Sequence, residues 1–359
     1  MRRNPPTPRR STPAFSAEAN VLQIKRAGHS TLTTPDIERM VDYFTRIVGL
    51  SLATREKNRA ILATKSGVES IVLERGSAVE APRLSFQVAP GSDLGEVAAR
   101  LKKEGIKSEK QTDITPGIGE AITFKDPKGT TLEIFSDFKF TAEDTNFNGI
   151  MPLKFGHIAY QCPDVKGVVK FYCDVLGFRV SDWRSDFFAF LRCSRDHHTV
   201  NFLRNADTAI HHIAFEVRDW SDIKRACDLL ARSNIQLTWG PIRHIIGHNI
   251  AIYHKNPDGV VIEFFCDIDQ MFDEELGFFE PRPWHQDRPQ RPKVWGDDTR
   301  SNWWGPMSRG SPGHGDAATA KPATTPSRQI EPGKRTPAHA PARSRQAQKK
   351  SGKPAKPRR

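Results

Sequence analysis

Two kinds of hydrophobic pattern alternate along the chain. Short apolar runs rich in β-branched and aromatic residues, bounded by turn-forming residues, predict strands. Segments in which apolar residues recur every three or four positions predict helices. The clearest predicted strands lie at 156–160, 186–191, 210–217, 249–253 and 260–265, and the predicted helices lie at 36–47, 93–104, 164–176 and 220–233. This mixture predicts an α+β fold.

The pattern of the first half returns in the second half at an offset of 128 to 130 residues. Each half reads strand, helix and further strands, twice over. We therefore expect two domains, each of two βαβββ modules that form a curved mixed sheet around a cavity. Four stretches match in the same order: 28–36 with 156–164, 43–50 with 171–178, 84–88 with 213–217, and 125–135 with 255–265.

The most informative stretch of the chain runs from His244 to Glu263. Its segment Asn256-Pro257-Asp258-Gly259 predicts a tight turn, because proline presets φ and glycine allows a positive φ. The segments on either side of the turn then form a hairpin. A glutamate inside the apolar run 260–265 would be costly to bury unless it is paired with a cation or bound to a metal ion.

Two histidines also stand where a strand should be apolar, His157 and His212. Two neutral imidazoles and one carboxylate form the ligand set of non-haem Fe(II) oxygenases, which leaves coordination positions open for a substrate and O2. We therefore predict that His157, His212 and Glu263 bind one divalent metal ion.

The first half does not repeat this ligand set. His29 and Glu133 keep their places, but Arg83 stands where the second half has His212. A guanidinium group stays protonated at physiological pH and so does not bind a metal ion. We predict that the first half is a structural remnant of the duplication and that the second half is catalytic.

Two histidine doublets leave a choice of residue. His197 precedes His198, and His211 precedes His212. On a strand, the side chains of neighbouring residues point to opposite faces. We therefore expect that one histidine of each doublet faces the metal site and that the other faces away from it.

These features resemble the vicinal oxygen chelate superfamily and, within it, the two-domain type I extradiol ring-cleavage dioxygenases. The resemblance covers about residues 22–285, and the string from His244 to Glu263 matches the family's signature pattern. The resemblance implies that Fe(II), or Mn(II) in some members, is bound by the three predicted ligands, with O2 as a co-substrate. It also implies a first domain without catalytic activity.

The resemblance assigns roles to three further residues. His198 matches the acid–base histidine, and the family register selects it and His212 from their doublets. His244 and Tyr253 match the pair that lies beside the bound substrate and oxygen. The implied reaction opens the ring of catechol or of an alkyl- or aryl-substituted catechol and incorporates both oxygen atoms, as in the degradation of aromatic compounds.

Two other functions remain open at this point. A glyoxalase-type lyase or isomerase shares the fold and often the type of metal site, but it lacks an acid–base histidine at the place of His198. A non-catalytic small-molecule binding protein of the same fold would have lost the ligand set, as the first half has. Oxygen consumption with a catechol would distinguish ring cleavage from both alternatives.

Changes in composition divide the chain into segments. The stretch after the predicted catalytic domain is rich in proline and aromatic residues, so we expect it to cover the active site or to bury a subunit interface. Phe187, Phe188 and Phe190 are candidates for an apolar wall of the substrate pocket. The predicted segments are a disordered basic arm at 1–21, a non-catalytic domain at 22–140, a linker at 141–152, a catalytic domain at 153–270, an extension at 271–306 and a disordered basic tail at 307–359.

The charge of the chain is concentrated in its tail. The chain has 359 residues, 37% of them hydrophobic, which is enough for two cores. Of its net charge of +12, most comes from residues 308–359, which contain 13 Lys and Arg against 2 Asp and Glu. A basic tail can bind nucleic acid, but this one has no aromatic residue that would stack on bases. We therefore do not expect nucleic acid as a partner.

Cysteine usage and hydropathy predict where the protein works. The five cysteines show no pairing pattern and are expected to be free thiols of a reducing cytoplasm. Residues 1–19 lack the apolar core of a secretory signal, and no run approaches the 18 apolar residues of a membrane helix. We predict a cytoplasmic protein without a membrane partner, and the family resemblance implies a homo-oligomer.

Overall fold

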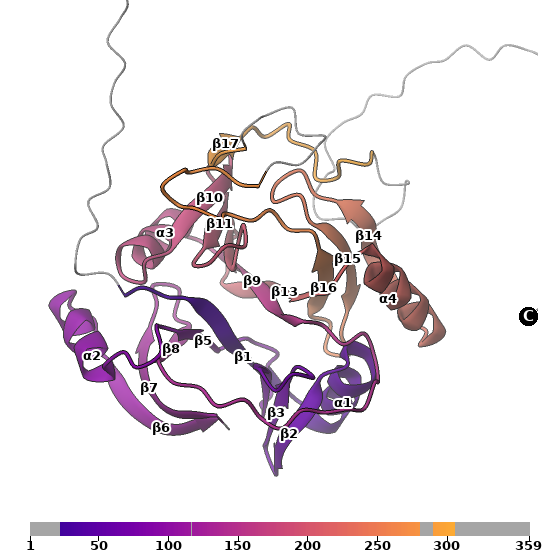
Figure 1. The fold of residues 1–359 in the computed structure, drawn as a ribbon, viewed down its shortest axis with the longest axis horizontal. Coiled ribbons are helices and arrows are strands. Elements are labelled where there is room, and N and C mark those ends of the chain that lie inside the picture. The colour runs from indigo at the N-terminus through magenta and orange to yellow at the C-terminus, as the bar shows by residue number, and fades with distance from the viewer. Residues whose placement is uncertain (1–21, 116, 281–289, 306–359) are drawn as a thin grey trace, which may run out of the picture. The chain divides into compact units, whose positions relative to one another are not determined.

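One order of elements occurs four times in the protein (Figure 1). The computed structural model describes residues 22–115, 117–280 and 290–305. Each module is a strand, a helix and three further strands, so the predicted α+β fold of tandem βαβββ modules is confirmed. The first half contains β1 (Arg26–Thr34), α1 (Ile37–Tyr43), the π-helical turn η1 (Phe44–Val48), β2 (Ser51–Glu56), β3 (Arg59–Ala63), β4 (Glu69–Arg75), β5 (Arg83–Gln87), α2 (Leu94–Lys103), β6 (Glu109–Thr115), β7 (Ile118–Lys125) and β8 (Thr131–Phe135). The second half contains β9 (Lys154–Cys162), α3 (Val165–Asp174), β10 (Arg179–Arg184), β11 (Phe188–Arg192), β12 (Val200–Arg204), β13 (Ala209–Glu216), α4 (Trp220–Arg232), β14 (Leu237–Arg243), β15 (Ile250–Lys255), β16 (Val261–Cys266) and β17 (Lys293–Trp295).

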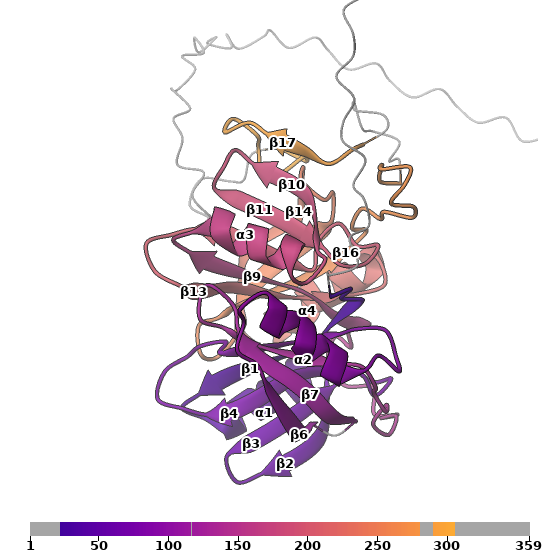
Figure 2. The ribbon, with the colours of Figure 1, turned by 90° about the vertical axis from the view of Figure 1, so that its left-hand side faces the viewer.

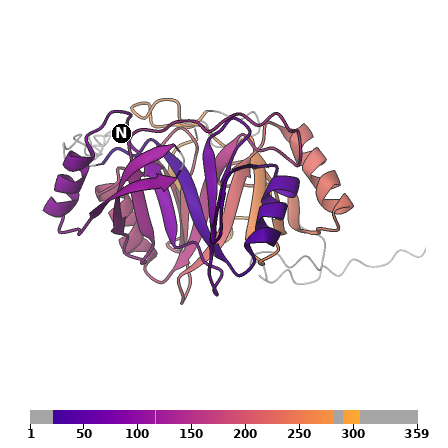
Figure 3. The ribbon, with the colours of Figure 1, turned by 90° about the horizontal axis from the view of Figure 1, so that it is seen from below.

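Each half forms one mixed sheet. The strand order is β2-β3-β4-β1-β5-β8-β7-β6 in the first half and β14-β15-β16-β13-β9-β12-β11-β10-β17 in the second half. Within every module the first strand pairs in parallel with the last strand. The two modules of a half join through their first strands, which run antiparallel. In Figure 2 the two sheets lie one above the other, and Figure 3 shows that the helices flank the strands.

An aspartate precedes each of the four α-helices in the described part of the chain. The side chains of Asp36, Asp93, Asp164 and Asp219 each accept a hydrogen bond from a backbone N–H of the first turn. Such a cap satisfies a donor that the helix cannot pair internally and stabilises the helix by about 1 kcal/mol. These caps explain why the predicted helix starts are correct to within one residue.

The first helix ends differently from the prediction. Regular α-helix stops at Tyr43 and continues as the π-helical turn η1, which ends at Val48 and is followed by Gly49 as its C-cap. Gly49 has a φ of +86°, and a Cβ atom there would lie 2.5 Å from the backbone oxygen of Asn148. Glycine is therefore required at this position both by its backbone conformation and by the close approach of the segment between the two halves.

Aromatic contacts join the cores of the two halves. Phe44 packs edge-to-face against Phe215 with a centroid distance of 6.4 Å, and Phe86 packs against Phe178 at 5.3 Å. All four side chains are buried in one continuous apolar cluster. Aromatic pairs of this kind contribute about 0.5–1.5 kcal/mol beyond the burial of their surface. The two halves therefore stabilise each other through a shared core.

Helix α1 of the first half also makes polar contacts with the hairpin β15–β16 of the second half. The hydroxyl group of Tyr43 lies 2.7 Å from Nε2 of His254, and both side chains are buried. Nη2 of Arg39 lies 2.6 Å from Oδ1 of Asp258 in the hairpin turn. Because this hairpin carries Glu263, the first half supports a strand of the predicted site.

The hairpin turn has the predicted conformation. Oδ1 of Asn256 accepts hydrogen bonds from the N–H groups of Asp258 and Val260. Gly259 has a φ of +85°, which glycine adopts without the steric cost that other residues have. The turn chemistry thereby sets the register of β15 and β16, in which Tyr253 pairs with Glu263.

The segment after β16 packs back onto the second half. Strand β17 pairs in parallel with β10, and the side chain of Phe279 is buried. The N–H of Trp303 donates a hydrogen bond to the carbonyl oxygen of Arg243. The predicted arm 1–21, the predicted tail 307–359 and positions 281–289 and 306 of the predicted extension lie outside the described residues.

Two expectations from composition can be compared with the structure. The five cysteines are free thiols: Cys162, Cys173, Cys193, Cys227 and Cys266. Among the helices of the described ranges, none has the length and hydropathy needed to cross a bilayer.

Replacing Tyr43 with Phe should destabilise the contact between the two halves. The substitution leaves a buried ring nitrogen of His254 without its partner, which costs about 1–3 kcal/mol. The free energy of unfolding measured by urea titration should fall by this amount. A double variant that also carries His254→Leu should lose less, since no buried nitrogen then lacks a partner. An unchanged free energy of unfolding in Tyr43→Phe would contradict the importance of this contact.

The stability of the protein should also depend on the protonation of His254. Burial lowers the pKa of His254 to about 3, whereas an unfolded histidine has a pKa of about 6.5. Between these values the unfolded chain binds more protons, so the free energy of unfolding falls as the pH drops from about 6.5 towards 3, by up to about 1.4 kcal/mol per pH unit from this group. The His254→Gln variant should show a shallower dependence in the same urea titrations. If the free energy of unfolding fell equally steeply with pH in the wild type and in His254→Gln, then His254 would not be the group responsible for the dependence.

Candidate metal centre

Three adjacent strands of the second half carry the predicted ligands (Figure 1). His157 lies on β9, His212 on β13 and Glu263 on β16. Ala214 pairs with His157 on one side and with Glu263 on the other, and His212 lies two residues before Ala214. Because side chains along a strand alternate with a period of two, the three side chains share one face of the sheet.

The donor atoms of these residues converge. Nε2 of His157 lies 3.1 Å from Nε2 of His212 and 3.1 Å from Oε2 of Glu263. Nε2 of His212 lies 3.2 Å from the same carboxylate oxygen. For ligands about 2.1 Å from a first-row divalent ion, donors at right angles to each other lie about 3.0 Å apart. The three atoms therefore fit three positions on one face of an octahedral ion.

No other group of three histidine, cysteine or acidic side chains with this spacing occurs in the described part of the chain. All three residues are buried. A buried carboxylate that faces two imidazoles and that no lysine or arginine of the described ranges pairs with is a donor set that suits a divalent cation. The residues present therefore fit the metal ion that the sequence led us to expect.

The protonation states suit metal binding as well. Burial lowers the pKa of His157, so its imidazole is neutral near pH 7. Burial by itself raises the pKa of Glu263, but its interaction with His157 and hydrogen bonds from His157 and His212 outweigh burial and hold this pKa well below its usual range. Metal ligands must be deprotonated, and these two meet that condition.

Neighbouring side chains orient the ligands. Nδ2 of Asn249 donates a 2.8 Å hydrogen bond to Oε1 of Glu263, the oxygen that does not face the imidazoles. Nδ1 of His212 lies 2.7 Å from Nδ1 of His211. The ring of His157 packs against Phe265 with a centroid distance of 5.0 Å. Such contacts fix the orientation of ligands and hence the shape of a metal site.

The expectation that His211 faces away from the site is wrong. The pairing of β13 with β9 shifts register between Ile210 and His212, which marks a β-bulge. A bulge interrupts the alternation of side chains, so His211 and His212 contact each other and both line the same cavity. A sequence pattern contains no signal for a bulge at this point.

A cavity of about 110 Å³ lies over the three ligands. This cavity is also lined by the three residues to which the resemblance assigned roles beside the metal site, His198, His244 and Tyr253. Its apolar wall consists of Phe188, Phe190, Trp239, Ile245 and Ile246. The cavity therefore combines a polar floor with walls that suit a flat apolar ring.

The three residues assigned by resemblance lie close to the ligands. The ring of His198 lies 4.3 Å from that of His157, centroid to centroid. Nε2 of His244 lies 2.6 Å from the hydroxyl of Tyr253, whose ring stacks on Trp239 at 5.1 Å. Burial lowers the pKa of His198 well below its usual value, and the neighbouring His157 adds to this effect. His198 is therefore neutral near pH 7 and able to accept a proton.

The first histidine doublet does not lie on a strand, contrary to the expectation. His197 and His198 belong to the loop between β11 and β12, which starts at Val200. In this loop Nδ1 of His197 lies 3.0 Å from Nδ1 of His198, and both side chains are buried. The argument from alternating strand faces therefore does not apply to this pair, although His198 still lines the cavity.

Other parts of the cavity wall were not identified from the sequence. Oδ1 of Asn201 is buried without a hydrogen-bond partner among the described residues, and this side chain lines the cavity. Residues 299–301 of the C-terminal extension line it as well. Of the three phenylalanines considered, Phe188 and Phe190 line the wall, whereas Phe187 lies in the turn before β11.

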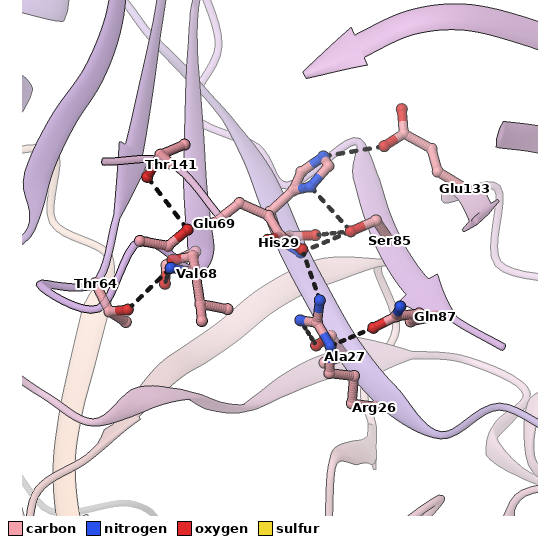
Figure 4. A network of polar contacts seen from close by, with 12 residues as sticks. Arg26, Ala27, His29, Thr64, Val68, Glu69, Ser85, Gln87, Glu133 and Thr141 are labelled. Atoms are coloured by element: carbon pink, nitrogen blue, oxygen red, sulfur yellow. Dashed lines mark hydrogen bonds and ion pairs between the residues drawn. The ribbon is translucent and has the colours of Figure 1, made fainter. Parts of the chain in front are cut away.

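The corresponding place in the first half is a network of charged groups (Figure 4). Nε2 of His29 lies 3.0 Å from Oε2 of Glu133, and Nδ1 of His29 lies 3.0 Å from Oγ of Ser85. Nε of Arg83 lies 3.5 Å from the other oxygen of Glu133. Ser85 pairs with Glu133 as Ala214 does in the second half, so Arg83 occupies the place of the second histidine. A guanidinium supplies here the positive charge that a metal ion would supply.

The two halves each match the same family model. Its description is the Glyoxalase/Bleomycin resistance protein/Dioxygenase superfamily, and the matched residues are 26–134 and 154–264. These ranges cover more than half of the chain. The chain belongs to this superfamily. The resemblance stated from the sequence is thereby confirmed.

Individual members of the superfamily extend the comparison. The chain is 25% identical over 264 residues to metapyrocatechase of Pseudomonas sp. (strain CF600), covering 68% of this chain and 86% of the relative. It is 30% identical over 265 residues to metapyrocatechase 2 of Cupriavidus necator, covering 67% and 80%. A crystal structure of homoprotocatechuate 2,3-dioxygenase from Brevibacterium fuscum matches with a TM-score of 0.69 and 21% identity, covering 82% of this chain and 93% of that one. That likeness supports the fold.

Replacing Glu263 with Gln should weaken metal binding at least tenfold, because a neutral amide replaces the charged ligand. Titration calorimetry with Mn(II), and metal analysis after loading with Fe(II), would measure the loss. The matched control is Glu133→Gln, which changes the corresponding carboxylate of the first half and should leave metal binding unchanged. Equal metal binding in both variants would contradict the assignment of Glu263 as a ligand.

Proposed function

We propose that this protein is an extradiol ring-cleavage dioxygenase that uses Fe(II) and O2 to open the ring of a catechol. The observation that carries the proposal is the convergence of His157, His212 and Glu263, with donor atoms 3.1–3.2 Å apart, beneath a cavity that His198 also lines. The ion would be bound by these three side chains. When bound, it supplies Lewis acidity and the electron transfer that a reaction of a catechol with O2 requires.

The cavity suits a catechol in shape and polarity. Phe188, Phe190 and Trp239 present aromatic faces to it, and the rings of Phe188 and Phe190 pack at a centroid distance of 4.4 Å. A planar aromatic substrate would bind between these walls with its hydroxyl groups towards the ligands. The substrate class is therefore catechol and its alkyl- or aryl-substituted forms.

His198 acts as the base in this proposal. Its buried, neutral imidazole accepts a proton from a catechol hydroxyl as the substrate binds and returns a proton later in the reaction. A positioned acid–base group of this kind contributes about 10²–10⁴-fold to a rate. The glyoxalase-like and purely binding alternatives do not require such a base beside the ligands.

Tyr253 and His244 act as a hydrogen-bonding pair beside the substrate. Burial raises the pKa of Tyr253 well above its usual value, and the charge of Glu263 adds to this effect. The phenol therefore stays protonated and can donate a hydrogen bond. With His244 2.6 Å from its oxygen, its orientation is restricted, so the pair can hold an oxygen atom of the substrate or of O2 in place.

Iron is the metal that the proposal names, with manganese as the second candidate. One relative of this chain, from Rhodococcus jostii (strain RHA1), is named an iron-dependent extradiol dioxygenase. Another, from Geobacillus genomosp. 3, is named a manganese-dependent 2,3-dihydroxybiphenyl 1,2-dioxygenase. Two imidazoles and a carboxylate can bind either ion, and relative turnover after loading with each would decide between them.

Assembly and location remain predictions from the sequence. We expect a homo-oligomer in the cytoplasm, with the catechol and O2 as its partners and without binding of nucleic acid by the basic tail. Light scattering of the purified chain would measure its oligomeric state.

Iron-loaded protein should consume one O2 per catechol and form a yellow ring-opened product. An oxygen electrode and the visible absorbance, read together over a panel of catechols, measure both. His198→Phe should keep its iron and lower kcat by about 10²–10⁴-fold. The control is Asp222→Asn, which changes a buried carboxylate on α4 outside the cavity and should leave kcat unchanged. Absence of oxygen uptake by the iron-loaded wild type would refute the proposed function.

A further inference from the structure

A chain of buried polar groups leads away from His198 on the side opposite the cavity. Nδ1 of His198 lies 3.0 Å from Nδ1 of His197, and Nε2 of His197 lies 3.1 Å from Oδ2 of Asp182. His197 and Asp182 have no solvent-exposed surface, and His198 is 4% exposed. The proposed function uses only His198, so the role of the other two groups is unexplained by it.

Asp182 is held in place by the C-terminal extension. Its Oδ1 accepts a 2.9 Å hydrogen bond from the backbone N–H of Lys293, and its Oδ2 accepts a 2.8 Å hydrogen bond from Nε1–H of Trp295. Both donors belong to β17, which pairs with β10, the strand of Asp182. With His197 included, three donors point at this carboxylate and fix its orientation.

The ring of His197 is fixed by packing as well. It lies 5.0 Å from the ring of Phe279, centroid to centroid, and its backbone N–H donates to the carbonyl oxygen of Asp269. On the other side, a Cβ atom at Gly247 would come within 3.1 Å of its Nδ1. The imidazole therefore has little room to rotate.

The hydrogen-bonding roles follow from the carboxylate. A carboxylate only accepts hydrogen bonds, so Nε2 of His197 carries its proton towards Asp182. A neutral imidazole has one N–H, and Nδ1 of His197 is then an acceptor. The nitrogen that faces it, Nδ1 of His198, must therefore carry a proton. In the neutral form of His198 this leaves a lone pair on Nε2, the nitrogen that is free for the cavity.

We propose that His197 and Asp182 are positioning residues that hold His198 in the tautomer required of a base, with the lone pair of Nε2 available to the substrate. The inference rests on the acid–base role of His198 in the proposed function. It also gives the C-terminal extension a role in the reaction, because Trp295 and the backbone of Lys293 orient Asp182.

The proton balance of the step is simple. The O–H bond of a catechol breaks, its electron pair stays on oxygen, and a new N–H bond forms at Nε2 of His198. The imidazolium keeps its Nδ1–H bond to His197, so no proton leaves the chain of groups. The carboxylate of Asp182, one ring away, stabilises the positive charge. In the serine-protease triad, replacing the corresponding aspartate with asparagine leaves the geometry intact but selects the wrong tautomer and lowers kcat by about 10⁴-fold.

The decisive variant is Asp182→Asn, which keeps the shape of the side chain. It is combined with Trp295→Phe, which removes the N–H that would oppose an NH2 group at the place of Oδ2. In this double variant the amide can present an N–H to Nε2 of His197, which moves the proton of His197 to Nδ1 and makes Nδ1 of His198 the acceptor. We expect kcat of the iron-loaded enzyme to fall about 100-fold, with KM for the catechol and iron content unchanged. The matched control is Asp222→Asn, a buried carboxylate on α4, which should leave kcat unchanged.

A double variant separates positioning from a general structural effect. In the His198→Phe background, Asp182→Asn should cause no further loss of kcat, because the group that it positions is gone. The same factor of loss in both backgrounds would overturn the proposal.

A second pair of variants guards against misfolding. His197→Asn keeps an acceptor oxygen near the place of Nδ1 and should retain most of the activity. His197→Leu removes this acceptor and should lose most of the activity. Equal activity of these two variants would also overturn the proposal.

A readout that needs neither metal nor turnover distinguishes failure of this inference from failure of the proposed function. In metal-free protein with ¹⁵N-labelled histidine, the signals of His198 are those that the His198→Phe variant lacks. We expect a protonated Nδ1 and an unprotonated Nε2 in the wild type and in Trp295→Phe, and the reverse when Asp182→Asn is combined with Trp295→Phe. A protonated Nε2 in the wild type would overturn the inference even if the enzyme cleaves catechols. If the wild type showed the expected tautomer of His198 but the iron-loaded enzyme took up no oxygen, only the proposed reaction would be refuted.

Discussion

The second half of the protein is organised around a carboxylate that lies in an otherwise apolar strand. Glu263 is 1% exposed and stands between Ile262 and Phe264, which are fully buried. Burying such a charge alone would cost several kcal/mol, so the fold must place positive charge or a cation beside it. Two imidazoles from the neighbouring strands meet it, and the three donor atoms have the spacing of one face of an octahedral ion. The remaining features of the site either orient these ligands or build the cavity above them.

The first half meets the same constraint in a different way. Glu133 is buried in the equivalent strand, and protein groups contact both of its oxygens, His29 on one side and Arg83, which also pairs with Glu74, on the other. A fixed guanidinium removes the need for a metal ion and at the same time removes the possibility of metal chemistry. The half remains useful because its helix α1 and its aromatic side chains support the catalytic hairpin. The two halves therefore share one fold, but only the second half has a donor set that fits a divalent ion.

The working site also depends on parts of the chain that lie far from the ligands in sequence. Residues 299–301 line the cavity, and β17 adds a strand beside β10 and donates hydrogen bonds to Asp182. The loop before β12 brings His197 and His198 together under Phe279. The candidate site is thus assembled from the sheet, one inter-strand loop and the extension. The sheet carries the candidate ligands, the loop carries the proposed base, and the extension contacts the group proposed to orient that base.

The sequence alone determined the four βαβββ modules and the duplication, and it identified His157, His212 and Glu263 as the candidate ligands that the structure brings together. Those features follow from periodicity and from polar residues in apolar runs, which are local signals. The tertiary structure decided the rest. His211 faces the cavity because of a β-bulge, His197 contacts His198 because both lie in a loop, and Asn249, Asp182 and Tyr43 found partners across long sequence separations. Bulges, loop conformations and long-range pairs depend on how distant segments pack against one another, and packing of that kind leaves no periodic trace in the chain.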